Sequence, residues 1–258
     1  MTEPTTHDSL LYGELTAHVR RMLEPVAHDS FLFFEDTIRL LEPEIPPGVR
    51  VFDAGCGRGT ITAWLAGRGC QVTAVDSNED HVEQTRELLM EKQLIENVRL
   101  RASFLPDRFP DEQFDVILDC FSWWHISDWG KLYNLSRKGL HQQGKLVILD
   151  TFFGWNTSLD FRQQTRELWQ AALPTYNESR NMLTKRDFRL VRCESIQEMY
   201  RRYLDAIVEK VQELEREDLG GVDPIELGRV KSMWEWFRRA AHNDELVATL
   251  IVAQLTQQ

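Results

Sequence analysis

The sequence predicts an α/β fold, with a doubly wound, mostly parallel sheet of seven strands covered by helices on both faces. Two observations support this prediction. Between Val49 and Thr151, short apolar runs typical of strands buried on both faces alternate with helical runs. Such alternation builds βαβ units and a parallel sheet. In addition, glycines follow the first apolar run directly, as they do where a strand turns sharply into a helix.

The chain begins with a segment that has a helical pattern. Apolar residues recur at steps of three and four between Leu10 and Leu41, with an interruption at Pro25. The stretch EPEIPPG at residues 42–48 stops this pattern. We therefore expect residues 1–48 to form a helical lid.

The regular alternation occupies residues 49–151. Its expected strands are 49–54, 71–75, 98–102, 114–120 and 145–151. Its expected helices are 60–67, 79–92 and about 129–140. Because successive strands joined through helices lie parallel, this part forms the core of the predicted sheet.

Beyond Asp150 the pattern is less regular. Two further strands are expected at residues 188–193 and 246–255, with a long helix at 196–214 between them. A second helix is expected to start at Asp223, a good N-cap residue, followed by Pro224.

These elements predict a single domain over residues 1–258, because neither of the two long helices has a core without the sheet. We expect residues 152–243 to form a cap over the substrate and residues 244–258 to contain the final strand.

Composition excludes several classes of partner. The 258 residues carry a formal net charge of −11, which disfavours nucleic acid and anionic membrane surfaces. No apolar run is long enough to span a bilayer, and no secretory signal is visible. Four scattered cysteines lack the spacing of a zinc site or a disulfide framework. We expect a cytoplasmic protein with reduced thiols and no metal, and the sequence indicates no particular oligomeric state.

The sharpest motif is VFDAGCGRG, residues 51–59, between the first strand and the first helix of the sheet. Its glycines, Gly55, Gly57 and Gly59, allow a tight turn and a close approach to a ligand. Asp76 ends the next strand, where a carboxylate can accept both hydroxyls of a ribose.

Two nucleotide cofactors compete for this motif. A dinucleotide site has the spacing GxGxxG and leaves backbone amides for a pyrophosphate. Here the spacing is GxGxG, and Asp53 precedes the first glycine. An acid so close would repel a pyrophosphate but suits an ammonium group. Ribose and ammonium without phosphate indicate S-adenosylmethionine.

The sequence at this point resembles the class I S-adenosylmethionine-dependent methyltransferases from about Val49 to Thr151. VFDAGCGRG is similar to the first motif of that family, and VTAVDSNED to the second. RFPDEQFDVILDCFSWWHISD and LYNLSRKGLHQQGKLVILD resemble the two segments that follow in order. The segment FRLVRCESIQEMYRRYLDAIVEKVQELE resembles the small-molecule branch, which includes cyclopropane-fatty-acid synthases and phosphoethanolamine and sterol methyltransferases.

The resemblance implies a Rossmann-like sheet whose last strand is antiparallel, a helical cap, and a cofactor site. It departs from the family pattern where Ser103 replaces an adenine-binding Asp, and where Asp187 replaces a glycine. The residues expected to bind the cofactor are Asp53, Gly55, Cys56, Gly57, Gly59, Asp76, Ser77, Ser103, Phe104, Asp119 and Cys120.

The expected reaction is methyl transfer to an O, N or C atom of a small, largely apolar or aromatic molecule. His125 follows the fourth strand at the edge where substrates lie and is the candidate catalytic residue. The residues expected to contact the acceptor are Tyr12, His28, Trp124 and Trp155. Two alternatives stay open: a methyltransferase of a carrier-protein-bound acyl group, and a cofactor-binding scaffold without turnover. An acidic carrier would need a basic patch, which only Arg180, Lys185, Arg186, Arg189, Arg201 and Arg202 suggest.

Overall fold

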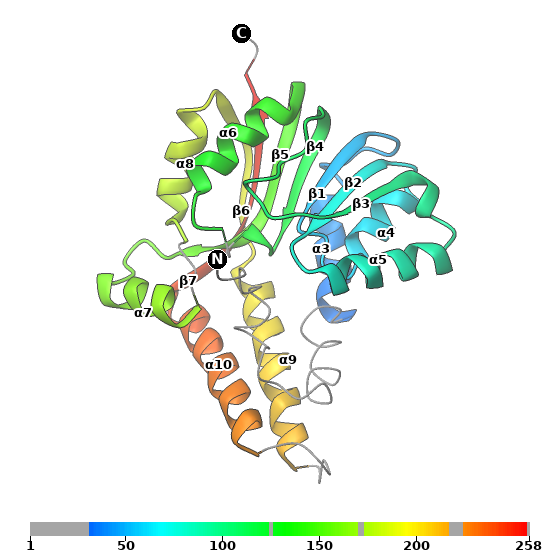
Figure 1. The fold of residues 1–258 in the computed structure, drawn as a ribbon. Helices are drawn as coiled ribbons and strands as arrows, with labels where there is room; N and C mark the ends of the chain where they lie inside the picture. The colour runs from blue at the N-terminus through cyan, green and yellow to red at the C-terminus, as the bar shows by residue number, and fades with distance from the viewer. Residues whose placement is uncertain (1–30, 124–125, 170–172, 217–223, 257–258) are drawn as a thin grey trace, which may run out of the picture.

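The computed structural model describes residues 31–123, 126–169, 173–216 and 224–256 (Figure 1). Within these residues a seven-stranded sheet has the order β3-β2-β1-β4-β5-β7-β6. The strands are β1 (Arg50–Ala54), β2 (Gln71–Asp76), β3 (Val98–Ala102), β4 (Phe114–Cys120), β5 (Leu140–Phe153), β6 (Phe188–Ser195) and β7 (Leu246–Leu255). The predicted sheet is confirmed strand by strand.

The pairing follows the prediction as well. Strands β1 to β5 pair in parallel, and β7 pairs antiparallel with both β5 and β6. The strand order reverses its direction between β1 and β4, and the carboxyl ends of these two neighbours therefore form a topological switch point. In open α/β sheets, ligands bind in the crevice at this point.

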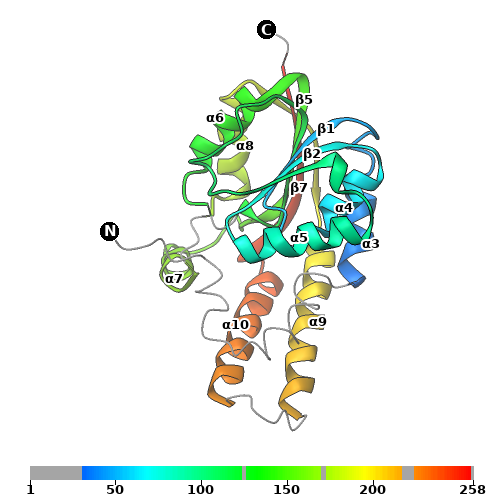
Figure 2. The same ribbon diagram turned by 45° about the vertical axis from the view of Figure 1, so that its right-hand side comes forward.

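Helices cover both faces of the sheet. The helices α3 (Phe31–Leu41), α4 (Thr60–Gly67) and α5 (Glu79–Glu91) lie on one side, and a short 3₁₀ helix, η1 (Ile95–Asn97), follows α5. The helices α6 (Trp129–Gly139) and α8 (Tyr176–Thr184) lie on the opposite side (Figure 2). Because the central strands are buried on both faces, Phe52, Ile117 and Leu118 are fully enclosed, as their apolar runs predict.

A helical hairpin stands at the carboxyl edge of the sheet. The helix α9 (Gln197–Arg216) leaves the end of β6, and α10 (Pro224–His242) returns to the start of β7. The two helices pack on each other and project away from the sheet (Figure 1). At 1.5 Å per residue, α9 alone is about 30 Å long. The helix α7 (Leu159–Trp169) lies at the same edge.

Two helices, α7 and α8, were not expected from the sequence pattern. The start of α8 is a capping box, in which Glu178 N donates to Thr175 Oγ1 at 3.1 Å and Thr175 N donates to Glu178 Oε2 at 2.6 Å. The signal was the Thr-x-x-Glu pattern at residues 175–178.

The placement of α8 also corrects the expected cap. The hydroxyls of Tyr133 in α6 and Ser179 in α8 share a buried hydrogen bond of 2.6 Å. Helix α8 therefore belongs to the layer that covers the sheet. Among the described residues of the segment 152–243, the helices that stand at the carboxyl edge are α7, α9 and α10.

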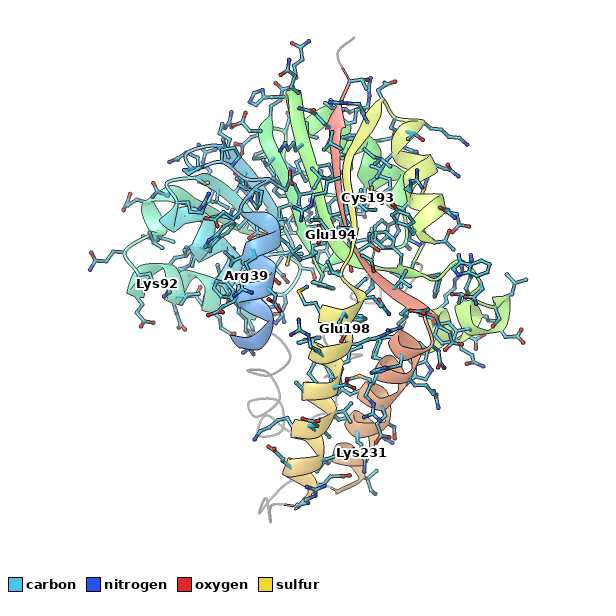
Figure 3. All side chains as sticks on the ribbon, turned by 180° about the vertical axis from the view of Figure 1, so that it is seen from behind. Arg39, Lys92, Cys193, Glu194, Glu198 and Lys231 are labelled. Carbon is cyan, nitrogen blue, oxygen red and sulfur yellow. The ribbon has the colours of Figure 1, made fainter. Side chains whose placement is uncertain are left out.

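The described end of the N-terminal segment is anchored to the body of the protein. Leu41 and Thr37 of α3 are buried, and α3 contacts α9. The view from behind shows α3, marked by Arg39, next to the first turns of α9, marked by Glu198 (Figure 3). Residues 31–41 are thus part of the folded core, and residues 1–30 of the expected lid lie outside the described residues.

Candidate functional site

The turn after β1 carries the predicted glycines, and all three have positive φ angles. The values are 111° for Gly55, 52° for Gly57 and 84° for Gly59. L-residues with a side chain rarely adopt such angles, so the glycines allow the chain to turn sharply into α4.

The three glycines differ in what an added side chain would meet. A Cβ on Gly55 would lie 2.2 Å from Ser122 Oγ, and one on Gly59 would lie 2.5 Å from Thr85 Cγ2. A Cβ on Gly57 would meet no atom within 4 Å. Gly55 and Gly59 are therefore required by the packing of the protein itself, and Gly57 faces open space at the switch point.

Asp76 lies beside Gly57 at the end of β2. Its Oδ2 accepts a hydrogen bond from Gly57 N at 2.9 Å, and its Oδ1 accepts one from Asn78 N at 3.0 Å. His81 Nδ1 lies 3.5 Å from Oδ1. Burial acts to raise the pKa of Asp76, but the hydrogen bond and charge of His81 and the two backbone N–H groups outweigh it and lower that pKa. The carboxylate is thus ionised, with both oxygens oriented.

The loop after β3 adjoins this carboxylate. Ser103 N donates to the carbonyl oxygen of Asp76 at 2.8 Å, and Ser103 Oγ donates to the carbonyl oxygen of Arg108 at 3.0 Å. Phe104 follows, with 41% of its surface exposed. Ser77 is half-buried between Asp76 and Asn78, the N-cap of α5. The predicted residues of the adenine side therefore surround the end of β2.

Asp53 and Cys56 are turned inward. Asp53 is only 2% exposed, and Thr62 Oγ1 donates to its Oδ2 at 2.6 Å. Burial raises the pKa of Asp53 to about 6, Thr62 acts to lower it, and the charge of Asp76 adds to the increase. Burial also raises the pKa of the Cys56 thiol, which is consistent with a neutral thiol packed under the loop.

Replacing Asp53 with asparagine is expected to make stability less dependent on pH. The pKa of Asp53 rises on folding from 3.8 to about 6, so the folded state binds this proton more tightly. The free energy of unfolding therefore falls by up to about 3 kcal/mol as pH rises through this window. Asparagine removes this effect and keeps an acceptor for Thr62. Denaturant unfolding of the wild type and of Asp53→Asn at about pH 4 and about pH 7 measures the change in the free energy of unfolding. If both proteins lose the same stability between these pH values, the raised pKa is not that of Asp53.

The end of β4 lies across the switch point from the glycine loop. Asp119 is fully buried, and its Oδ1 accepts hydrogen bonds from Ser122 N at 3.1 Å and Trp123 N at 3.1 Å. Cys120 is half-buried, and burial raises the pKa of its thiol. The Asp119 side chain already accepts hydrogen bonds from the loop that follows β4. Contacts of Asp119 and Cys120 with a cofactor stay a prediction.

Residues that sequence reasoning did not single out join the two loops. Ser122 Oγ donates to the carbonyl oxygen of Ala54 at 2.6 Å, and Trp123 Nε1 donates to the same oxygen at 3.0 Å. Tyr200 of α9 stacks on Phe121 with ring centroids 6.0 Å apart. No local pattern indicates these pairings, since each joins segments far apart in the chain.

The predicted catalytic residue and the predicted acceptor contacts stay predictions. Tyr12, His28, Trp124 and His125 lie outside the described residues. Trp155 lies on the surface after β5 and is 85% exposed. Its contact with an acceptor stays a prediction.

The residues at the switch point fit S-adenosylmethionine. Gly57 offers open space where a side chain would obstruct a ligand, and Asp76 next to it presents an ionised, oriented carboxylate to ribose hydroxyls. Gly57, Asp76, Ser77, Ser103 and the backbone of Phe104 would hold the nucleoside half of this cofactor.

Comparisons with known proteins agree with this fit. Residues 52–148 match the family model described as a methyltransferase domain. A ubiquinone/menaquinone biosynthesis C-methyltransferase from Shewanella sediminis is 34% identical over 110 residues, which span 40% of this chain and 43% of that relative. The chain thus matches less than half the length of this curated relative.

Solved structures share the whole fold. Phosphoethanolamine N-methyltransferase 2 from Haemonchus contortus, in complex with phosphomonomethylethanolamine and S-adenosylhomocysteine, superposes with a TM-score of 0.82 over 99% of this chain and 62% of that chain. A cyclopropane synthase from Mycobacterium tuberculosis gives 0.81 over 98% of this chain and 100% of its own. Both are 17% identical, a level at which the likeness shows the fold alone.

Residues 52–148 thus match a methyltransferase domain, and the whole fold is that of the class I S-adenosylmethionine-dependent methyltransferases. Beyond these residues, β6, β7 and the helical hairpin complete the fold. The family resemblance and the Rossmann-like sheet with its antiparallel last strand are confirmed.

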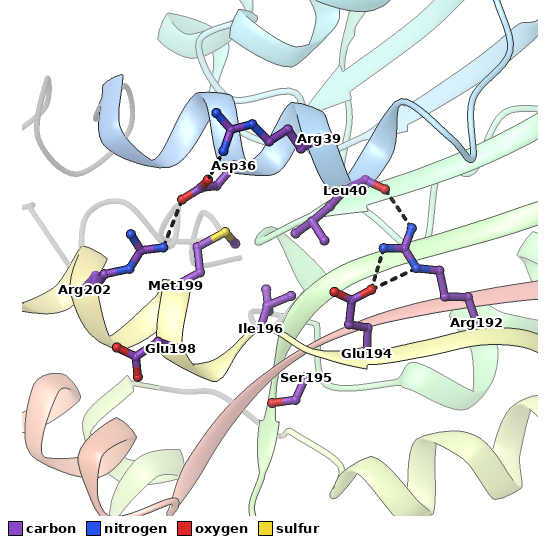
Figure 4. Close-up of a pocket in the computed structure, with 10 residues that line it drawn as sticks. All are labelled: Asp36, Arg39, Leu40, Arg192, Glu194, Ser195, Ile196, Glu198, Met199 and Arg202. Atoms are coloured by element: carbon purple, nitrogen blue, oxygen red, sulfur yellow. Dashed lines mark hydrogen bonds and ion pairs between the residues drawn. The ribbon is translucent and has the colours of Figure 1, made fainter.

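A separate groove of about 430 Å³ lies between α3, the end of β6 and the start of α9 (Figure 4). Its arginines are paired with carboxylates. Arg192 Nη1 donates to Glu44 Oε1 at 3.2 Å and to the carbonyl oxygen of Leu40 at 3.2 Å, and Arg202 Nη2 donates to Asp36 Oδ2 at 3.1 Å. These contacts fasten α3 to β6 and α9, so the groove has a structural role.

The described residues contain neither a membrane-spanning helix nor a candidate metal cluster. Among them, no helix has both the length and the apolar character that a membrane crossing requires. In the same part of the chain, no cluster of three or more His, Cys, Asp or Glu side chains is arranged to hold a metal ion.

Proposed function

We propose that the protein transfers a methyl group from S-adenosylmethionine to an O, N or C atom of a small, largely apolar or aromatic molecule. The observation that supports this most is the pairing of Asp76 with Gly57 at the switch point. Bound S-adenosylmethionine would supply an electrophilic methyl group on a sulfonium.

The role of the chain is to bind and orient the reactants. The two oxygens of Asp76 each have a backbone N–H partner, and their remaining lone pairs are positioned to accept ribose hydroxyls. Because the two backbone N–H groups hold the carboxylate in place, it needs little reorganisation on binding. Such positioning supplies much of the rate of a displacement reaction, and no universal base is required. A role for His125 as a base stays a prediction.

An apolar acceptor is supported by the aromatic pair next to the end of β4. Phe121 directly follows that strand, and Tyr200 reaches it from α9 in the cap. Most other cap aromatics pack on one another. Phe161 of α7 stacks on Trp236 of α10 at 4.9 Å, and Trp236 contacts Phe237 at 5.1 Å. Among the described aromatic residues, Phe121 and Tyr200 are the stacked pair that joins the end of β4 to the cap.

The alternative of an acidic carrier protein is disfavoured by the ion pairs of the cap. Arg201 pairs with Asp244 at 2.7 Å, and Arg202 pairs with Asp36 at 3.1 Å. Two cations that would have to attract a carrier are thus neutralised within the protein.

The test is release of S-adenosylhomocysteine from S-adenosylmethionine in the presence of a small-molecule extract. We expect release with the extract alone and no further increase when an acyl-loaded carrier protein is added. Release that needs the carrier would favour the carrier-bound substrate. Binding of S-adenosylhomocysteine without turnover on any extract would favour the scaffold, and a preference for NAD over S-adenosylhomocysteine would contradict the proposed cofactor.

Deletion of residues 1–30 is expected to abolish turnover and to leave a folded protein that binds S-adenosylhomocysteine more weakly. The proposed lid would exclude water from the reacting atoms, and its removal would expose them. The deletion ends before α3 because Thr37 and Leu41 are part of the core. Circular dichroism, calorimetry and the release assay measure the three properties. Full turnover by the shortened protein would mean that the segment is not a lid.

A further inference from the structure

Two buried carboxyl groups lie at the ends of adjacent strands, Asp119 on β4 and Asp150 on β5. A single backbone N–H joins them, since Trp123 N lies 3.1 Å from Asp119 Oδ1 and 3.0 Å from Asp150 Oδ2. Both side chains are fully buried. Two ionised carboxylates so placed would repel each other in a medium that screens charge poorly.

The hydrogen bonds around Asp119 have one donor proton too few for the acceptors that lie there. Its Oδ2 is buried, and no donor among the described residues reaches it. The Ser122 hydroxyl carries one proton, yet two acceptors lie close to its oxygen: the carbonyl of Ala54 at 2.6 Å and Asp119 Oδ1 at 2.7 Å. A neutral Asp119 can donate its one proton to Asp150, with which it forms a side-chain hydrogen bond, because a neutral carboxyl group can donate where an ionised one cannot.

Among the described residues, the other ionisable side chains that act on the pair are Cys120 on β4, Tyr133 on α6 and Tyr200 on α9, and all three are acids. Burial and the charge of Asp150 raise the pKa of Asp119 well above its ordinary value, and burial raises that of Asp150 to about 6. The surroundings therefore favour retention of a proton.

We propose that Asp119 is a neutral carboxylic acid that shares its proton with Asp150, and that this pair is a positioning element for the cofactor loop. The inference about the loop rests on the proposed function. Asp119 holds the 121–123 turn, and that turn holds the Ala54 carbonyl through Ser122 Oγ and Trp123 Nε1. Ser122 also fills the space that a side chain on Gly55 would occupy.

Infrared spectroscopy tests the proton directly, without any cofactor. The difference spectrum of wild type minus Asp119→Asn is expected to contain the C=O absorption of a protonated carboxyl group. Asp115→Asn is the matched control on the same strand, because Asp115 Oδ2 accepts a hydrogen bond from Arg50 N near the opposite end of β4. Its difference spectrum should lack that absorption.

Calorimetry with S-adenosylhomocysteine tests the positioning role. Asparagine keeps a donor and an acceptor, so Asp119→Asn should bind within about threefold of wild type, whereas Asp119→Ala should bind at least about tenfold more weakly. Ionisation of the pair at high pH should weaken binding by wild type, and the affinity of Asp119→Asn should stay constant over the same range. Thermal unfolding of each variant confirms that it is folded.

The outcomes separate this inference from the proposed function. An ionised Asp119 in wild type overturns the inference even if S-adenosylhomocysteine binds. If Asp119→Asn binds as weakly as Asp119→Ala, the shared proton does not position the loop. A protonated Asp119 in a wild-type protein that does not bind S-adenosylhomocysteine would overturn the proposed function and leave the proton assignment in place.

Discussion

Replacing Asp76 with alanine is expected to weaken the binding of S-adenosylhomocysteine by about 2 to 3 kcal/mol, or about 30- to 150-fold. The substitution removes an ionised carboxylate that we propose accepts two ribose hydroxyls. It also releases Gly57 N, which donates to Asp76 Oδ2. Isothermal titration calorimetry of the variant and the wild type measures the difference.

Asp80→Ala is the matched control, because Asp80 is an exposed acid in the first turn of α5. Its hydrogen bond to Asn78 Oδ1 comes from the backbone N–H, which alanine keeps. Asp80→Ala changes the charge by the same amount, and its affinity should equal that of wild type. Asp76→Asn, which keeps the shape of the side chain, should lie between the other two proteins. Equal binding by wild type and Asp76→Ala would refute the assignment of the ribose site.

Replacing Gly57 with alanine is expected to reduce the affinity for S-adenosylhomocysteine at least about tenfold, a loss of about 1.4 kcal/mol or more. The new methyl group would project into the open space beside Asp76 that the cofactor would occupy. The φ angle of 52° adds strain, which costs about 1 to 2 kcal/mol of stability for a residue with a side chain.

Gly69→Ala separates these two effects. Gly69 has a φ angle of 78°, and a Cβ there would also meet no atom within 4 Å. It follows the C-cap of α4, at the opposite end of that helix from the glycine loop. Both variants should lose similar stability in thermal unfolding, and only Gly57→Ala should lose affinity. A similar loss of affinity in both variants would show that the effect is one of stability and that the cofactor does not occupy the space beside Gly57.

The strands and most of the helices were predictable because their signals are local. The buried strand Arg50–Ala54, the helix Thr60–Gly67 and the final strand Leu246–Leu255 each have the apolar pattern of their element within a few residues. The helix Leu159–Trp169 escaped prediction because its apolar residues are few, and Tyr176–Thr184 because its capping box was the main signal.

The candidate cofactor site was predictable in part for the same reason. Glycines at alternate positions after a strand, and an acid at the end of the next strand, are local patterns with a known geometric consequence. Gly57 and Asp76 were therefore found from the sequence. Their mutual hydrogen bond required the parallel pairing of β1 with β2, which the order of the elements predicts.

The sequence by itself determined the fold class, the order of the strands along the chain and the position of the glycine loop. Tertiary structure alone decided which glycine faces open space, that Asp119 turns towards Asp150, and that Tyr200 meets Phe121. Each of these facts depends on contacts between segments distant in the chain. Local periodicity records which face of an element is buried, and it does not record which side chain of another element fills the space opposite.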